Sequence, residues 1–113
     1  MRKTSMLRAF IISATVLFAT PVLSKGEMNA TWYQCCNRTA NGEKFDPNGM
    51  TAAHRTYPFG TMLRVTHKDK TVVVRINDRG PFRKDYQLDL SRGAAFAIGC
   101  RGTCKVKYEI VPR

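Results

Sequence analysis

An aspartate ends an apolar run and is followed at once by a tight turn, in the stretch VVVRINDRGPF. Residues 72–76 predict a buried strand, and Asp78 stands where that strand ends. A carboxylate at the rim of a core, partly removed from water, is suited to act as a general acid. Gly80 and Pro81 would fix the turn and so the direction of the side chain. Alternatively, Asp78 only caps this turn by accepting backbone N–H groups.

Two more charged residues bear on this site. Arg79 would either bind an anionic substrate or pair with Asp78, which would make Asp78 a poor acid. Asp89 lies between two leucines in the stretch LDLS. On a strand, a residue between two core residues points to the opposite face, here toward a groove. Alternatively, Asp89 places a negative charge before the helix expected after Ser91.

Four other side chains could serve the same groove. His54 is a lone histidine in AAHRT, either structural or a proton carrier near neutral pH. Glu43 lies in a glycine-rich loop and could reach the site. Trp32 and Tyr33 are neighbours on a strand, so we expect one in the core and one at a face where it could stack on sugars. Such a groove suits polysaccharide chemistry, although the spacing does not show that two carboxylates converge, as a glycosidase usually requires.

Short strands are predicted over most of the remaining chain. Periodicity and composition predict strands at 30–34, 61–67, 71–77 and 105–111 and an extended piece at 85–90. The second and third strands would form a hairpin. Ser91 is a good N-cap for a helix over Arg92–Ile98, which Gly99 would end. Residues 37–50 predict a loop, and 51–56 are either a helical turn or extended. Together these elements predict a compact, mainly β barrel.

The first 24 residues have the pattern of a secretory signal peptide. Three basic residues within 1–8 precede an uncharged, mostly apolar run at 9–19, and a proline and small residues follow, ending at Ser24. A membrane anchor is the alternative, but the run is shorter than the ~20 apolar residues of a spanning helix. We therefore expect cleavage after Ser24, a single domain over 25–113, and export to the periplasm or the extracellular space.

The expected mature domain is basic. Residues 25–113 hold 16 Lys and Arg residues and 8 Asp and Glu residues, a net charge of +8. Such a charge usually indicates nucleic acid, but export argues against it, so we expect attraction to anionic wall polymers instead. Alternatively, the scattered charge only keeps the domain soluble. We expect a monomer without cofactor or metal and, once the leader is removed, without membrane attachment.

The four cysteines, all in the mature part, predict two disulfides in an exported domain of this size. Zinc is disfavoured because Cys35 and Cys36 are adjacent and the compartment is oxidising. A bridge between these neighbours would be strained. We therefore expect each of them to bridge to Cys100 or Cys104, in an order that the sequence leaves open.

Three stretches carry a resemblance to a known family: TANGEKFDPNGMTAAHRTYPFGTMLRVTH, VVVRINDRGPF and LDLSRGAAFAIG. In this order they resemble the rare lipoprotein A (RlpA) family of septal lytic transglycosylases, over about residues 30–111. The resemblance implies a six-stranded double-psi β-barrel with one or two short helices. It also implies cleavage of peptidoglycan glycan strands, preferably free of stem peptides, to 1,6-anhydro-muramoyl ends.

The same resemblance implies roles for individual residues. Asp78 would be the general acid, assisted by His54, while Glu43 and Asp89 line the groove. A second carboxylate is not needed as nucleophile, because the sugar's own 6-hydroxyl attacks. Together with Arg79 and the two aromatic residues of the first strand, these are the expected substrate-binding side chains.

The chain also departs from the family pattern. RlpA proteins usually carry a lipobox cysteine and often a SPOR domain, and since neither is found here we expect a free barrel. The stretch TWYQCC resembles the YWDCC opening of family-45 endoglucanases, but Gln34 stands where their catalytic Asp would be, which disfavours inverting hydrolysis. Their adjacent cysteines bridge to distant ones, which supports cross-bridging here.

Two other functions are compatible with such a barrel. One is a non-catalytic, expansin-like protein that binds or loosens the wall; expansins share the Asp of DLS but lack the AAH and NDRGPF pair seen here. The other is a secreted effector or inhibitor, for which the sequence has no motif. The AAH and NDRGPF pair favours the enzyme.

Overall fold

The structure is a computed structural model that describes residues 24–112. The signal peptide expected over 1–24 lies outside the described residues, apart from Ser24. Within residues 24–112, no helix is both long and apolar enough to cross a membrane.

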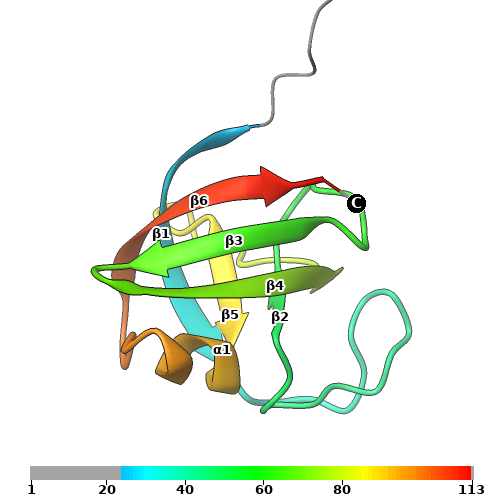
Figure 1. Ribbon diagram of the computed structural model, residues 1–113. Helices are drawn as coiled ribbons and strands as arrows, with labels where there is room; N and C mark the ends of the chain where they lie inside the picture. Colours follow the sequence, from blue (N-terminus) through cyan, green and yellow to red (C-terminus); the bar gives the residue numbers. More distant parts are fainter. Residues whose placement is uncertain (1–23, 113) are drawn as a thin grey trace, which may run out of the picture.

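Six strands and one short helix follow one another along the chain (Figure 1). They are β1 (Lys25–Tyr33), β2 (Thr51–Ala53), β3 (Met62–His67), β4 (Lys70–Asp78), β5 (Leu88–Ser91), α1 (Arg92–Ala97) and β6 (Cys104–Val111). The predicted hairpin is confirmed as β3 and β4, and the first strand begins five residues earlier than expected. The ambiguous stretch 51–56 is extended at its start, where it forms β2.

The strands close into a barrel in the order β1-β5-β2-β4-β3-β6. Two pairs, β1 with β5 and β2 with β4, are parallel, and the other four are antiparallel. This arrangement confirms the prediction of a mainly β, six-stranded barrel with one short helix. Each strand therefore has a neighbour on both sides over at least part of its length, which pairs backbone N–H and C=O groups that a sheet edge would expose.

Alternate residues along the strands fill the barrel. Leu63 and Val65 of β3 are fully buried, as are Val74 and Ile76 of β4, whereas Arg64 between the first two is exposed. This is the period of two that a half-buried strand requires. Residues on the other face of each strand are therefore free to build a surface site.

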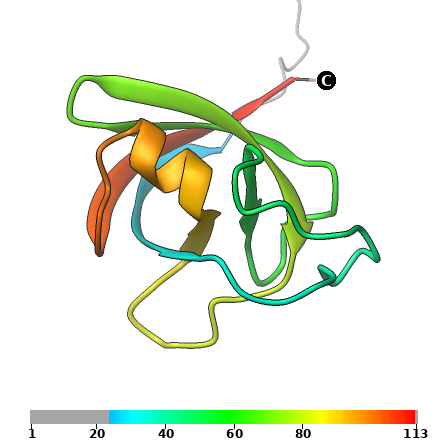
Figure 2. The ribbon, with the colours of Figure 1, turned by 90° about the horizontal axis from the view of Figure 1, so that it is seen from below.

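The helix lies across one end of the barrel and packs against β1, β4 and β5 (Figure 2). Ser91 caps it as predicted, because its side chain accepts a hydrogen bond from Ala94 N at 3.2 Å. The start of the helix also holds the long loop over 37–50. A Cβ on Gly93 would meet Asn48 Cα at 2.8 Å, so only glycine allows the loop to approach this closely.

The expected pairing of the cysteines is wrong. Cys35 bridges to Cys36 and Cys100 to Cys104, with Cα atoms 3.7 and 6.0 Å apart. The register of the barrel separates Cys104 from Cys35, because Cys104 lies beside Ala30 of β1. The last residue of β1, Tyr33, is already about 10 Å further along the strand, and Cys35 comes two residues later. A disulfide spans at most ~7 Å between Cα atoms.

Candidate active site

Asp78 and Asp89 lie in one row across the outer face of three neighbouring strands. Asp89 of β5 is in register with Ala53 of β2, which in turn is in register with Asp78 of β4. Residues in register on adjacent strands point to the same face of a sheet. The two Cα atoms are therefore two strand spacings apart, about 10 Å, which is close enough for both carboxyl groups to reach one sugar linkage.

A β-bulge brings Asp78 into this row. Ala52 pairs with Ile76, but the next residue, Ala53, pairs with Asp78, so that Asn77 is the extra residue of β4. Bulges turn the side chains that follow them and are frequent beside active sites. Without the extra residue, the site face would carry Asn77 in place of the carboxylate.

Three donors from different parts of the chain bind the Asp78 carboxylate. Tyr33 Oη donates to Oδ2 at 2.9 Å, and the backbone N–H groups of Ala40 and Arg79 donate to Oδ1 at 2.8 and 2.9 Å. The carboxylate therefore serves as an acceptor in this site. Asp78 was expected either to cap the turn or to present its carboxylate at a surface site. It does both, since it accepts from Arg79 N in the turn and lies on the outer face of the barrel.

Asp89 lies in a more apolar environment. Its flanking residues Leu88 and Leu90 are completely buried, and Asp89 itself is half-buried on the opposite face, as predicted. Among the described residues, no hydrogen-bond partner reaches its buried Oδ1 atom. Burial, and then the nearby charge of Asp78, raise the pKa of Asp89 to about 6. The capping role falls to Ser91 instead.

The two aromatic residues of β1 separate as expected. Trp32 packs edge-on against Phe96 of α1, with ring centroids 5.1 Å apart, and contacts the core. Tyr33 faces the site, where its ring stacks on Phe45 at 4.7 Å. Burial, the hydrogen bond to Asp78 and the charges of both aspartates raise the pKa of Tyr33 far above its ordinary value. Its hydroxyl therefore keeps its proton and acts as a donor.

His54 is held beside the same strand end. Its backbone N–H donates to Asp78 O at 3.2 Å, and its ring stacks on Tyr57 at 3.7 Å. The ring Nδ1 atom accepts from the backbone N–H groups of Thr56 and Tyr57 at 3.2 and 3.0 Å. Burial, followed by the charges of Arg55 and Arg79, lowers the pKa of His54. A neutral ring with Nδ1 as acceptor carries its hydrogen on Nε2.

Arg79 is used within the protein. Its guanidinium donates to the backbone oxygens of His54 and Tyr57 at 3.2 and 2.9 Å and lies over the ring of Phe59 at 3.9 Å. Of the two expectations for this residue, the pair with the Asp78 carboxylate does not form among the described residues. Its guanidinium instead ties the strand end to the chain that follows β2.

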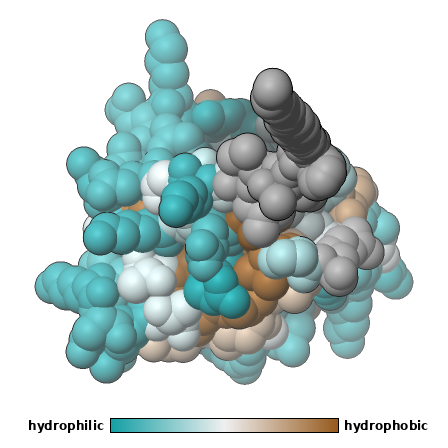
Figure 3. Space-filling view, turned by 45° about the horizontal axis from the view of Figure 1, so that its top comes forward, coloured by the Kyte–Doolittle hydropathy of each residue, from teal (hydrophilic) through white to brown (hydrophobic). Residues whose placement is uncertain are grey.

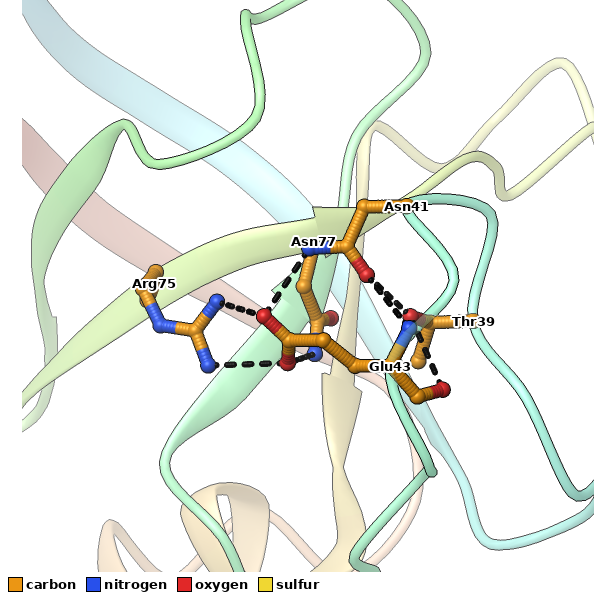
Figure 4. A network of polar contacts seen from close by, with 5 residues as sticks. All are labelled: Thr39, Asn41, Glu43, Arg75 and Asn77. Atoms are coloured by element: carbon orange, nitrogen blue, oxygen red, sulfur yellow. Dashed lines mark hydrogen bonds and ion pairs between the residues drawn. The ribbon is translucent and has the colours of Figure 1, made fainter.

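Glu43 holds the loop 37–50 onto β4 (Figure 4). Its carboxylate accepts two hydrogen bonds from Arg75, at 2.6 and 2.9 Å, and one each from Asn41 and Asn77, at 2.9 and 3.1 Å. These bonds, led by those of Arg75, lower the pKa of Glu43 to about 2. The same loop supplies the Ala40 N–H that binds Asp78, so Glu43 positions a ligand of the candidate acid.

Two parts of this site, the Ala40 N–H group and the ring of Phe45, could not be predicted from the residue pattern. The Ala40 donor is a backbone N–H group and could belong to any residue type. Phe45 is buried beneath Tyr33, but its place depends on the path of a long loop. Only the loop's own turn residues could be recognised in advance.

A hollow in the surface lies elsewhere. A depression of about 550 Å³ lies over β1, β3 and β6, across the barrel from the aspartates, and its lining includes Arg64, Lys107 and Glu109. Figure 3, which brings the upper part of Figure 1 forward, shows mainly hydrophilic side chains around one hydrophobic area. Within residues 24–112, no group of three or more His, Cys, Asp or Glu side chains is placed to hold a metal ion.

The chain matches the family described as lytic transglycolase over residues 25–108. A probable endolytic peptidoglycan transglycosylase RlpA from Synechocystis is 53% identical over 89 residues, which are 73% of this chain and 28% of the relative. The endolytic peptidoglycan transglycosylase RlpA of Pseudomonas aeruginosa PAO1 is 49% identical over 87 residues, 71% of this chain and 25% of that protein. The chain thus spans about a quarter of the length of these relatives.

Two solved structures share the fold. The Streptomyces papain inhibitor superposes with a TM-score of 0.67 at 21% identity, covering 79% of this chain and 96% of the inhibitor. An expansin of Clavibacter michiganensis superposes with a TM-score of 0.65 at 25% identity, covering 79% of this chain and 51% of the expansin. Barrels of this shape therefore occur in proteins with different functions.

Proposed function

This chain belongs to the lytic transglycolase family, and from that membership we propose that its barrel cleaves the glycan strands of peptidoglycan and leaves 1,6-anhydro-muramoyl ends. The RlpA proteins to which the chain is similar are named as transglycosylases that act on peptidoglycan. The proposal extends that activity to a chain that corresponds to about a quarter of their length. Export to the wall, in the periplasm or outside the cell, is part of the same proposal.

The observation that carries the proposal is the pair of aspartates in one row with opposite surroundings. Asp78 accepts three hydrogen bonds, whereas Asp89 has a buried oxygen without a partner among the described residues. Acid and base roles are assigned where the environments of two titratable groups differ in this way. With a pKa of about 6, Asp89 holds a proton in a fraction of the molecules near neutral pH.

We therefore propose that the two carboxyl groups divide the chemistry. Protonated Asp89 donates its proton to the glycosidic oxygen, the bond from that oxygen to C1 of the muramoyl residue breaks, and Asp78 stabilises the positive charge that develops at C1. The 6-hydroxyl of the same sugar then attacks C1, and its proton returns to Asp89. The resemblance gives the acid role to Asp78; the hydrogen bonds favour Asp89 for the proton and Asp78 for the charge.

The remaining residues are assigned supporting roles. Neutral His54 presents Nε2–H as a donor, and we propose that it binds an oxygen of the glycan beside the cleaved bond. Tyr33 holds the Asp78 carboxylate in place from below through its hydroxyl. Glu43 and Arg79 act through the loop and the strand end that they fix, and Trp32 contributes through its packing on the core.

The proposal is tested by digesting purified peptidoglycan, with and without stem peptides, and identifying the products by mass spectrometry. The wild-type protein should release anhydro-muramoyl products, faster from peptide-free strands. Asp78→Asn and Asp89→Asn should each lose at least about a hundredfold in rate, the typical contribution of one general acid or base. Asp69→Asn, the same change in the exposed turn between β3 and β4, is the matched control and should be fully active.

Other results would change the assignment in defined ways. Products with ordinary reducing ends would identify a hydrolase. Full activity of Asp89→Asn, with loss only in Asp78→Asn, would return the acid role to Asp78. If no products form while the protein still pellets with the polymer, the enzyme is excluded and an expansin-like wall-binding protein remains.

A further inference from the structure

A large aromatic side chain is left almost fully exposed on the segment that connects the two aspartates. Phe82 is 80% exposed, whereas the other large hydrophobic residues at the described surface, Met50, Phe59 and Val73, are each about 40% exposed. Single exposed apolar residues are common on proteins. Phe82 differs from such residues in its degree of exposure, in where it lies, and in how its backbone is held.

Phe82 belongs to the connection that joins the two carboxylates. The chain leaves β4 at Asp78 and enters β5 at Leu88, one residue before Asp89. Both aspartates therefore lie at the ends of the segment 79–87, and Phe82 lies within it, four residues after Asp78. The segment therefore starts and ends at the row that holds the two carboxyl groups.

The segment is fixed in place although its tip is exposed. Arg55 Nη1 donates to the backbone oxygens of Pro81 and Tyr86 at 2.7 and 2.8 Å, so that one guanidinium ties both limbs of the segment together. Gly80 and Pro81 are themselves buried, and Gly80 has a φ of +124°, which glycine adopts without strain. The backbone that carries the Phe82 ring is thus pre-organised before any ligand binds.

A second aromatic ring lies in the same segment. The guanidinium of Arg83 lies over the ring of Tyr86, 4.7 Å from its centroid. One face of Tyr86 is therefore already occupied. The Phe82 ring approaches Gly80 at one side but is 80% exposed, so it is the more open of the two rings to a flat ligand.

We propose that Phe82 is a stacking platform for a pyranose ring of the glycan strand, next to the linkage that the aspartates cleave. One face of a pyranose ring is lined with C–H groups, and these fit the negatively charged face of an aromatic ring. A rigid, exposed aromatic side chain provides this contact with little loss of conformational freedom. The proposal rests on the glycan-cleaving function proposed above and assigns to it a sugar-binding position.

The test uses substitutions that separate a flat ring from mere apolar character. Phe82→Trp keeps a flat ring, Phe82→Leu keeps an apolar side chain without one, and Val73→Ala is the control at another exposed apolar residue. Affinity for peptide-free glycan oligosaccharides is measured by calorimetry in the Asp78→Asn background, where turnover is blocked. KM and kcat for release of anhydro-muramoyl products are measured in the otherwise wild-type protein, and thermal unfolding checks that every variant is folded.

Phe82→Leu should weaken binding and raise KM by roughly three- to tenfold, the range for one aromatic contact, with little change in kcat. Phe82→Trp and Val73→Ala should match the parent protein. Equal affinity and KM for Phe82→Leu and the parent would overturn the platform while leaving the transglycosylase intact. Loss of glycan binding in Phe82→Leu, in a protein that releases no products, would support the platform and overturn the enzyme.

Discussion

At the scale of single residues, the surroundings of two identical side chains assign them different tasks. Asp78 and Asp89 share a face and a row, but donors from β1, the loop 37–50 and Arg79 all reach Asp78. None of the described residues donates to the buried oxygen of Asp89. A charge on Asp89 is therefore poorly solvated, and the resulting cost in folding stability is what would keep a proton available in the proposed reaction.

This cost predicts that replacing Asp89 stabilises the protein at high pH only. At pH 4, Asp89 is still protonated in the folded chain and only about half ionised in the unfolded chain, so Asp89→Asn should raise the free energy of unfolding only slightly. As the pH rises through about 6, the folded chain must ionise a half-buried group whose pKa is raised, and stability is lost. At pH 8, Asp89→Asn should thus be more stable by about 1–2 kcal/mol, allowing for screening by solvent.

Urea unfolding of both proteins at pH 4 and pH 8 checks this difference. Asp69→Asn serves again as control, since Asp69 lies in an exposed turn and its substitution should change neither value. Equal stability of wild type and Asp89→Asn at pH 8 would show that the folded protein does not penalise the charge of Asp89. The proton-donor role proposed for this residue would then lose its basis.

At the scale of elements, the site depends on a long loop that several contacts fix to the barrel, two of which stand out. Glu43 binds Arg75 of β4, and the chain at Asn48 packs on Gly93 at the start of α1. Ala40 lies in the same loop, between the end of β1 and Glu43, and its N–H group donates to the Asp78 carboxylate. The geometry of the carboxylate thus depends on contacts made some distance from it along the chain.

Removing the charge of Glu43 should loosen this loop without unfolding the barrel. Glu43→Gln weakens the pair with Arg75, so we expect faster hydrogen exchange over residues 39–45 and a fall in kcat of roughly three- to tenfold, as for loss of about 1 kcal/mol. Because the pKa of Glu43 is lowered to about 2, its stabilising effect should be present above pH about 4.5 and disappear as the pH falls through about 2.

A second ion pair gives the matched control. Glu109→Gln makes the same change in the pair between Arg64 and Glu109 on β3 and β6, away from the aspartates. That variant should keep the exchange rates of residues 39–45 and the full activity. If Glu43→Gln behaves in the same way, the loop is held by other contacts, and Glu43 is not a positioning residue.

The elements themselves were largely predictable, and the contacts between them were not. Alternation identified the β3–β4 hairpin and β6, and Ser91 marked the start of α1, because these signals are local in the chain. The bulge at Asn77 depends on which residue of β2 lies opposite, and the sequence does not encode that neighbour locally. The predicted cysteine pairing was wrong for a related reason, since the register of β1 with β6, which separates Cys104 from Cys35, is not a local signal either.

The local pairing of the cysteines predicts a simple result for peptide mapping. After tryptic digestion without reduction, peptide 26–38 should carry both Cys35 and Cys36 and remain unlinked, while peptides 93–101 and 102–105 should be joined through Cys100 and Cys104. Mass spectrometry distinguishes these products directly. Detection of peptide 26–38 linked to either of the other two would restore the cross-bridged arrangement.

At the scale of the whole molecule, charge is spread around the barrel. The outer face of β6 carries two lysines followed by a glutamate. The neighbouring strand β1 places opposite charges beside two of them, since Lys25 lies across from Glu109 and Glu27 lies across from Lys107. Such cross-strand pairs offset one another locally. The net charge of +8 over residues 25–113 is therefore expected to act as a diffuse, long-range field.

A diffuse field predicts attraction to anionic wall polymers that weakens as salt rises. Pelleting of the Asp78→Asn protein with whole cell walls should decline between about 50 and 500 mM salt, because the screening length falls from roughly 14 to 4 Å. Walls stripped of their anionic polymers should bind less protein at low salt and lose this dependence. Stacking of Phe82 on a sugar ring is not an ionic contact, so binding to neutral glycan should change little over the same range. If retention on whole walls is insensitive to salt, the basic residues serve solubility alone, and non-ionic contacts to the glycan account for the binding.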